Sequence, residues 1–140
     1  MASFRQSLRE LLRLLRSASP RRPSAHPRER GFQLLTRNLS PAQREQYEMR
    51  GYFEVIGGDT GQRYRIRQGH QMNVEQLDKN GRQTGRLCFM PRGHLPVGDV
   101  MLAQKLALEL FESDALRTAH RTPAWDYLLE EDMRLIYSHR

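Results

Sequence analysis

The feature that most constrains the fold is a two-residue periodicity that begins at Tyr52. Apolar and polar side chains alternate through residues 52–56 and 63–67, as they do in β-strands that bury one face. The loop between them, residues 57–61, has the sequence Gly-Gly-Asp-Thr-Gly and favours a chain reversal. These two runs are therefore predicted to form a β-hairpin.

A second hairpin is predicted around residues 78–81, where the Asn80-Gly81 pair suits the positive φ angles of a tight turn. The flanking runs, residues 72–77 and 86–90, are the expected strands. Within the latter run, residues 87–90 are apolar on both faces, which is typical of a central strand. Because the connections are short, the four strands are expected to be neighbours in sequence order, as an antiparallel meander.

Helix signals precede this region. Ser40, Pro41 and Gln43 have the spacing of an N-cap, a first-turn proline and a capping-box partner, and Gly51 lies where a helix commonly ends. The sequence therefore predicts a helix of about three turns before the sheet. Order is expected to begin near Leu39.

Two amphipathic helices are expected after the sheet. Asp99 can cap the first, which runs to about residue 111 and turns Lys105, Glu109 and Glu112 toward solvent. The second covers residues 122–140 and starts at Thr122-Pro123. Its expected buried face comprises Trp125, Leu128, Leu129, Met133 and Ile136, with Glu130, Glu131 and Asp132 outside. The predicted class is therefore α+β: a four-stranded antiparallel meander with a helix before it, two amphipathic helices after it and a basic N-terminal arm.

The N-terminal arm carries most of the positive charge. Residues 1–30 hold eight arginines against two glutamates, a net charge of +6, whereas residues 31–140 are almost neutral at +1. Residues 3–17 place leucines and arginines on opposite flanks of a predicted basic helix. Residues 17–30, rich in Ser, Pro and Arg, are expected to be a flexible linker. The division expected is 1–30 for arm and linker, 31–121 for the core domain and 122–140 for the last helix.

The arm admits three interpretations that the sequence does not separate. Its arginines could hold nucleic-acid phosphates, its leucine face could lie on an anionic membrane, or its composition could mark a mitochondrial-type transit peptide. The single cysteine, Cys88, forms no internal disulfide, which favours a reducing, cytoplasmic compartment. A mitochondrial matrix location is the alternative if the arm is a transit peptide. No apolar run approaches the roughly 20 residues that span a bilayer.

The best functional candidate is the predicted strand at residues 63–67. Arg63, Arg65 and Arg67 share one face at a repeat of roughly 7 Å, near the phosphate spacing of an extended single strand, while Tyr64 and Ile66 share the other. Tyr52 or Phe53 could add a stacking ring. The alternative is a solvated face, or ion pairs with the acidic C-terminal helix. The full candidate anion-binding set comprises Arg63, Arg65, Arg67, Arg82, Arg86 and Arg92, with Arg5, Arg9, Arg13 and Arg16 of the arm.

Nothing in the sequence forms a convincing reactive site. Cys88 with His94 is the only arrangement suggesting a thiol nucleophile, and a cysteine inside an apolar strand is better explained as a buried small hydrophobe. The five histidines lack helical i, i+4 pairing, and residues 57–61 lack the Gly-Lys-Ser/Thr ending of a P-loop. We therefore expect no catalytic residue, cofactor or metal.

The middle of the chain contains the runs Gly51-Tyr52-Phe53-Glu54-Val55, Tyr64-Arg65-Ile66, Asn73-Val74 and Asp99-Val100-Met101-Leu102-Ala103-Gln104-Lys105. In these runs it resembles a group of small uncharacterised bacterial and phage proteins. It covers about residues 39–119. It implies a compact domain between two variable ends, and it brings no activity, cofactor or site.

These observations favour a non-catalytic accessory or adaptor protein that binds an anionic partner, nucleic acid first among them. The contacts would be the basic strand face and the N-terminal arm. The alternative is a protein interaction subunit that docks a partner through Trp125 and Leu129, with the arm on a membrane surface or acting as a targeting segment. The identity of the partner and the oligomeric state do not follow from the sequence.

Overall fold

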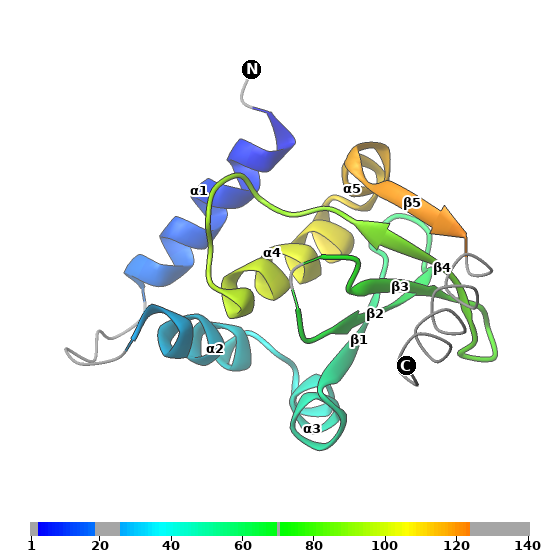
Figure 1. Cartoon of the computed structure of the whole chain (residues 1–140), viewed down its shortest axis with the longest axis horizontal. Coiled ribbons are helices and arrows are strands. Elements are labelled where there is room, and N and C mark those ends of the chain that lie inside the picture. The colour runs from blue at the N-terminus through cyan, green and yellow to red at the C-terminus, as the bar shows by residue number, and fades with distance from the viewer. Residues whose placement is uncertain (1–2, 19–25, 70, 124–140) are drawn as a thin grey trace, which may run out of the picture.

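The computed structural model describes residues 3–18, 26–69 and 71–123. Within these ranges the chain forms five helices and one five-stranded antiparallel sheet, which confirms the predicted α+β class (Figure 1). The helices are α1 (Phe4–Ser17), α2 (Pro27–Arg37), α3 (Pro41–Arg50), α4 (Val97–Leu110) and α5 (Glu112–Thr118). The strands are β1 (Tyr52–Ile56), β2 (Arg63–Arg67), β3 (Val74–Leu77), β4 (Gln83–Cys88) and β5 (His120–Pro123), and their order in the sheet is their order in the sequence.

Both predicted hairpins form. In the first, Val55 of β1 pairs with Tyr64 of β2, and in the second Val74 of β3 pairs with Leu87 of β4. Gly81 adopts the left-handed conformation with a φ of 79°, but Asn80 does not have a positive φ. The predicted tight turn, with positive φ angles at the Asn-Gly pair, is therefore only partly realised, and residues 78–82 connect the two strands. The meander is therefore present, and β5 extends it by one strand.

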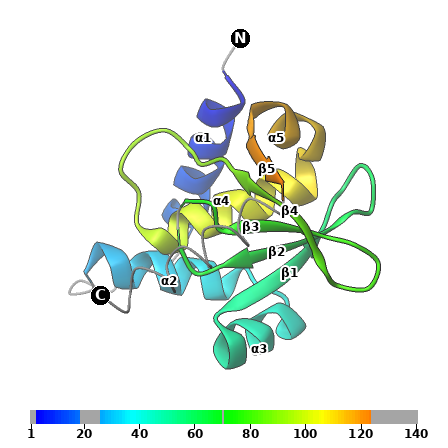
Figure 2. The ribbon, with the colours of Figure 1, turned by 45° about the vertical axis from the view of Figure 1, so that its right-hand side comes forward.

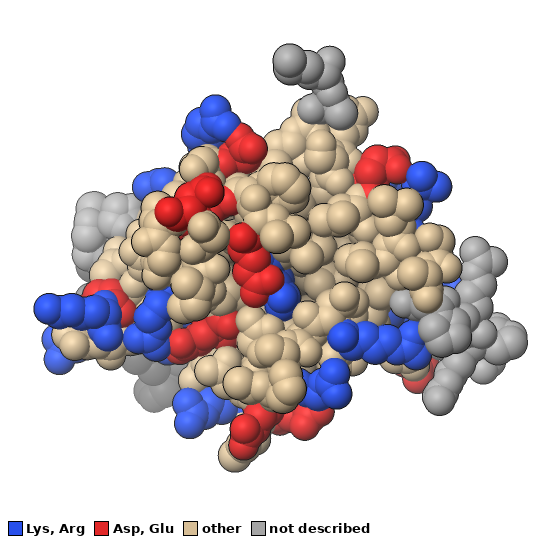
Figure 3. Space-filling model, turned by 180° about the vertical axis from the view of Figure 1, so that it is seen from behind, with Lys and Arg blue, Asp and Glu red and all other residues tan. Residues whose placement is uncertain are grey.

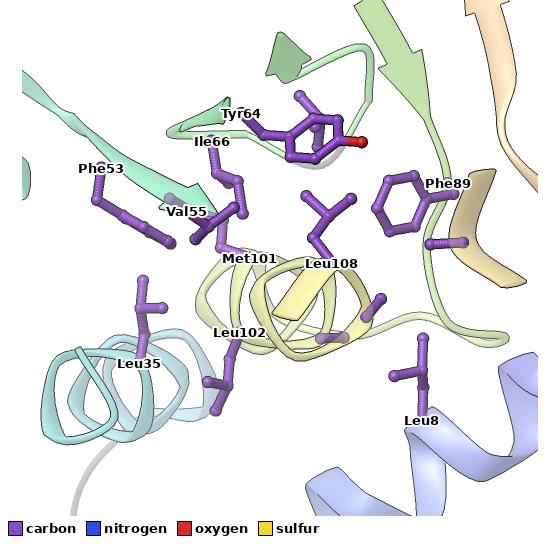
Figure 4. Packing of buried hydrophobic residues seen from close by; sticks show 14 of the residues in the cluster. Leu8, Leu35, Phe53, Val55, Tyr64, Ile66, Phe89, Met101, Leu102 and Leu108 are labelled. Atoms are coloured by element: carbon purple, nitrogen blue, oxygen red, sulfur yellow. The ribbon is translucent and has the colours of Figure 1, made fainter. Parts of the chain in front are cut away.

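The core has three layers, with α4 in the middle (Figure 4). One face of the sheet, which includes Phe53 and Tyr64, packs on one side of α4, and α1 and α2 cover its other side. Ten of the fourteen residues of α4 are buried because the helix is covered on two sides. The expected solvent-facing side of this helix is therefore wrong at Lys105, which is 9% exposed and pairs with Glu109 at 2.6 Å. It is also wrong at Glu112, which is fully buried and belongs to α5.

The start of α4 also differs from its prediction. Asp99 was expected to be the N-cap, but the helix begins at Val97 after Pro96, and no side chain caps it. Asp99 lies buried in the first turn instead. An acidic side chain is favourable there because the N-terminal end of a helix carries partial positive charge.

Helix α3 follows its sequence signals and also protects the edge of the sheet. Ser40 Oγ accepts a hydrogen bond from the Gln43 amide, Gln43 Oε1 accepts one from the Ser40 amide, and Gly51 ends the helix at a φ of 70°. Gln43 Nε2 then donates to the carbonyl of Glu54, and Gln46 Oε1 accepts from its amide, both at 2.9 Å. The outer backbone groups of β1 are therefore satisfied at Glu54, which blocks the addition of another strand there.

The N-terminal helix is confirmed as α1, but it is part of the folded body. Leu8 and Leu12 are 1% and 2% exposed and belong to the same core cluster as the sheet residues. The helical part of residues 1–30 is therefore not a free arm. The apolar side of the predicted amphipathic helix is used for packing against α4.

Helix α2 was not predicted, and its first residues, 27–30, lie within the expected flexible linker. Pro27 occupies the first turn of α2, and His26 Nδ1 accepts a hydrogen bond from the Arg28 amide. Leu34 and Leu35 of this helix are buried, so the expectation that order begins near Leu39 is wrong. The remaining linker residues, 19–25, lie outside the described ranges.

The close approach of α2 to α4 depends on two glycines. A Cβ on Gly98 would lie 2.3 Å from the carbonyl carbon of Gly31, a distance that requires the backbone to move. No composition-based argument identifies this pair, because each glycine is inside a helix where it normally weakens the structure. The contact explains why a glycine is present at each position.

The C-terminal prediction fails at its start. Thr122 and Pro123 belong to β5, which pairs with β4, so no helix begins there. The short helix α5 was also missed. Residues 124–140, including Trp125 and Leu129, lie outside the described part of the chain.

Candidate anion-binding surface

The candidate surface is the face of the sheet opposite α4. Strand β2 turns Tyr64 and Ile66, both 0% exposed, into the core, and this alternation places its three arginines on the other face. The strand register sets Glu54, Arg65, Glu75 and Arg86 opposite one another across β1, β2, β3 and β4. Acidic and basic side chains therefore alternate in one row across the sheet.

Glu54, at one end of this row, binds two of the predicted arginines. Its carboxylate lies 2.8 Å from Arg63 and 3.5 Å from Arg65. The hydrogen bond from Arg63 to Glu54 and the negative charge of Glu54 raise the pKa of Arg63. Arg63 also donates to the carbonyl of Lys79, so its guanidinium is held at the edge of the row.

Glu75 is the centre of the row, with a side chain only 2% exposed. Three arginines surround its carboxylate, with Arg67 at 2.7 Å, Arg65 at 3.2 Å and Arg86 at 3.8 Å. A buried carboxylate requires such partners because an isolated ion would lose its hydration without compensation. Much of the positive charge that the sequence indicates for this face is therefore neutralised by ion pairs within the protein.

The three arginines of β2 differ in how much of each side chain is accessible to a ligand. The side chain of Arg65 is 17% exposed and donates to both carboxylates, so it has little to offer. The side chains of Arg63 and Arg67 are 37% and 46% exposed. Four guanidinium groups, including that of Arg86, stand against two carboxylates, which leaves this row with a net charge of +2.

Tyr52 lies beside the basic row at the start of β1. The guanidinium carbons of Arg65 and Arg67 are 4.6 and 5.3 Å from the centre of its ring, a cation–π geometry. Arg50 donates to the phenol oxygen at 3.0 Å, and this hydrogen bond raises the pKa of Arg50. Of the two rings suggested for stacking, Phe53 is fully buried and only Tyr52 is partly accessible.

The arginines of α1 fall into two groups. Arg13 pairs with Glu10 on the same helix, and Arg16 pairs with the buried carboxylate of Asp99 on α4. Burial, with a contribution from the charge of Arg30, lowers the pKa of Arg16. Among the described residues, Arg5 and Arg9 have no carboxylate within salt-bridge distance.

The remaining predicted site residues are scattered. Arg82 is exposed in the β3–β4 turn, and Arg92 is exposed in the loop between β4 and α4. Figure 3 shows the molecule from behind, where basic and acidic side chains alternate around the rim and form no continuous patch of one sign. Trp125 and Leu129, the expected partner-binding residues, lie outside the described ranges.

The cysteine has a different neighbour from the one considered in the sequence. Cys88 is half-buried on β4, and the register sets it opposite His120 of β5, whereas His94 belongs to the following loop. No hydrogen bond joins Cys88 to either of these two described histidines. Within the described ranges, no group of three or more His, Cys, Asp and Glu side chains is placed to hold a metal ion.

The glycine-rich loop at residues 57–61 surrounds a carboxylate of the protein itself. Glu112, at the start of α5, is fully buried and accepts hydrogen bonds from the amides of Asp59 and Thr60, from Thr60 Oγ1 and from Tyr64 Oη. Asp59 in turn accepts from the Ser113 amide and hydroxyl. The loop therefore holds α5 in place, in keeping with its interpretation as a hairpin loop.

The residues that sequence reasoning missed are the carboxylates Glu54 and Glu75. Both lie at alternate strand positions that share a face with the arginines, so the signal was present in the two-residue periodicity. This signal identifies ion pairs only once the strand register is known, because the register places Glu54 and Glu75 opposite Arg65.

Comparison with known proteins finds no matching family model, no similar curated protein and no similar solved structure. In the described part of the chain, no helix is long and apolar enough to cross a bilayer.

Proposed function

We propose that this chain is a non-catalytic accessory protein that binds an anionic partner through exposed guanidinium groups, with nucleic acid as the partner class. The observation that carries the proposal is the surplus of arginine over carboxylate on the sheet row, where four arginines pair with two glutamates and a net charge of +2 remains. Arg63 and Arg67 would make the contacts.

The spacing of these two side chains suits an extended polyanion. They are four residues apart on one strand and on one face, which corresponds to about 13 Å. Arg65 lies between them and is held by Glu54 and Glu75, so it would position the row rather than contact the ligand. Tyr52, partly accessible beside Arg67, would offer a ring edge to a base.

The test is the binding of a fluorescently labelled single-stranded oligonucleotide, followed by anisotropy at several salt concentrations. Affinity should fall steeply with salt, and Arg63→Ala or Arg67→Ala should each lower the slope of log K against log salt by about 1. Arg117→Ala is the matched control, because Arg117 is also an exposed arginine paired with an acid, Asp114, but on α5.

Two results would contradict the proposal. One is the absence of binding at low salt, which would leave the protein interaction subunit as the better hypothesis. The other is an equal loss in Arg117→Ala and Arg67→Ala, which would indicate a response to net charge alone.

The interpretations of α1 as a membrane-surface helix or a cleaved targeting segment receive less support. Both require the helix to leave the fold, yet Leu8 and Leu12 are buried against it and Arg16 is paired with Asp99. The compartment remains a prediction from the sequence.

A further inference from the structure

Two basic segments that are far apart in the sequence meet at Gly93. This glycine has a φ of 99°, and a Cβ built on it would lie 3.8 Å from Nη1 and 3.9 Å from Cζ of Arg9. The guanidinium of Arg9 on α1 therefore lies directly beside the backbone of the loop between β4 and α4. Figures 1 and 2 both show this loop passing alongside α1.

The loop carries further basic residues next to Gly93 in the sequence. Arg92 precedes Gly93 and His94 follows it, and both are exposed, as is Arg9. Arg5 lies one turn before Arg9 on α1. We call this place the Gly93 corner: Gly93 with its sequence neighbours Arg92 and His94, and Arg9 and Arg5 of α1.

No described acid balances this charge. Residues 89–96 contain no Asp or Glu, and the one glutamate within α1, Glu10, is paired with Arg13. The nearest acid of α4 by sequence, Asp99, is paired with Arg16. Among the residues that the structure describes, Arg9 and Arg92 have no carboxylate within salt-bridge distance. The corner therefore differs from the sheet row, where two glutamates neutralise much of the positive charge.

Packing does not explain why the charge is here. Leu8 and Leu12 anchor α1 in the core, and the Arg16–Asp99 pair joins its end to α4, so the helix does not require Arg9 for its position. Exposed arginines that have no carboxylate within salt-bridge distance can attract an anionic ligand. A guanidinium presents a planar set of donors that matches phosphate oxygens, and two of them can bind one phosphate from different sides.

We propose that the Gly93 corner is a phosphate-binding site in which Arg9 and Arg92 hold one backbone phosphate of a nucleic acid. The inference rests on the proposed function for the identity of the ligand, and adds a contact point separate from the sheet row. Helix α4 lies between α1 and the sheet (Figure 4). A nucleic-acid strand that contacts both the sheet row and the Gly93 corner must therefore pass around the body of the protein.

The experiment uses the full chain, labelled with ¹⁵N, and two probes titrated separately: inorganic phosphate and a short single-stranded DNA. The Gly93 amide and the Arg9 Nε–H should shift saturably with both probes, while Arg13 Nε–H should not. Arg9→Gln and Arg92→Gln should each weaken DNA binding about threefold to tenfold at low salt and lower the salt slope by about 1. The double variant should lose less than the product of the two single losses, because both side chains hold the same phosphate.

Arg13→Gln is the matched control, since it removes the same charge from the same helix at a residue already paired with Glu10. Thermal unfolding of each variant shows whether it folds, and Arg9→Lys provides a second test that keeps the charge but removes the planar donor set. Partial loss in Arg9→Lys supports the site.

The outcomes separate this inference from the proposed function. If DNA binds and neither Arg9→Gln nor Arg92→Gln weakens it, the corner is not a site and the proposed function stands. If phosphate shifts the Gly93 amide but DNA does not bind, the corner is a phosphate site, while nucleic acid as its ligand and the proposed function are both overturned. An equal loss in Arg13→Gln and Arg9→Gln contradicts the site, because binding would then follow overall charge.

Discussion

Replacement of Glu112 tests how the glycine-rich loop is held to the helical layer. Its carboxylate is fully buried, with Oε2 accepting from the amides of Asp59 and Thr60 at 2.8 Å. Oε1 accepts from Thr60 Oγ1 at 2.6 Å and from Tyr64 Oη at 2.7 Å. Glu112→Ala removes all four acceptor contacts, whereas Glu112→Gln keeps the shape and one carbonyl oxygen.

The two substitutions should differ in magnitude for a structural reason. In Glu112→Gln the carbonyl oxygen can face the two amides, which only donate, while the new NH₂ group faces the two hydroxyls, which can rotate to accept. We expect a loss of about 1–2 kcal/mol in the free energy of unfolding. Glu112→Ala leaves the buried Tyr64 hydroxyl and two amides without this partner, and should cost about 3–4 kcal/mol, reduced somewhat because water reaches the exposed loop.

The pH dependence gives the result that would refute this reasoning. Burial opposes ionisation of Glu112, but its hydrogen bonds to Thr60, Tyr64 and Asp59 outweigh that effect and hold its pKa below the ordinary value of a glutamate. A lowered pKa contributes stability above the unfolded value and loses it as the pH falls through the folded value. The difference in the free energy of unfolding between the native protein and Glu112→Gln, measured by urea unfolding, should therefore shrink as the pH is lowered from about 7 to about 3. A constant difference would show that the charge contributes nothing.

Two further predictions use urea unfolding near neutral pH. Gly98→Ala should destabilise the protein by about 3 kcal/mol because its Cβ would lie 2.3 Å from the Gly31 carbonyl carbon. Gly31→Ala should cost about 1 kcal/mol because its Cβ would lie 3.0 Å from Pro96 Cβ. Equal costs would argue against the close contact between α2 and α4. Leu8→Ala should cost about 2–5 kcal/mol because Leu8 is 1% exposed, and Leu14→Ala on the same helix should change stability by less than about 0.5 kcal/mol. Similar small effects at both leucines would mean that α1 is not docked.

Features that depend on neighbouring residues were predictable. The capping box at Ser40 and the left-handed Gly51 each require only a few adjacent positions, and both form as expected. At the Asn-Gly pair only Gly81 takes the left-handed conformation. The alternation within β2 likewise places Tyr64 in the core without knowledge of the rest of the fold.

Features that depend on distant packing were not predictable. Helix α4 is buried on two sides, so its Lys105 is enclosed although a single amphipathic face would leave it in solvent. Helix α2 exists in a Pro- and Arg-rich region because Gly31 lets it approach Gly98. The neutralisation of the strand arginines needed the register that brings Glu75 opposite Arg65, and no local pattern specifies which strands pair.

The docking of α1 changes what its amphipathic pattern means. A helix with leucines on one side and arginines on the other resembles a membrane-surface or import segment when it is considered alone. Here Leu8 and Leu12 are turned into the core, and this same orientation leaves Arg9 exposed beside Gly93. Removal of α1 would therefore uncover the apolar surface of α4 and take Arg9 from the Gly93 corner in one step. Folding and phosphate binding at this corner are coupled through one helix, so a variant that undocks α1 should impair both, whereas Arg9→Gln should weaken binding and leave folding unchanged.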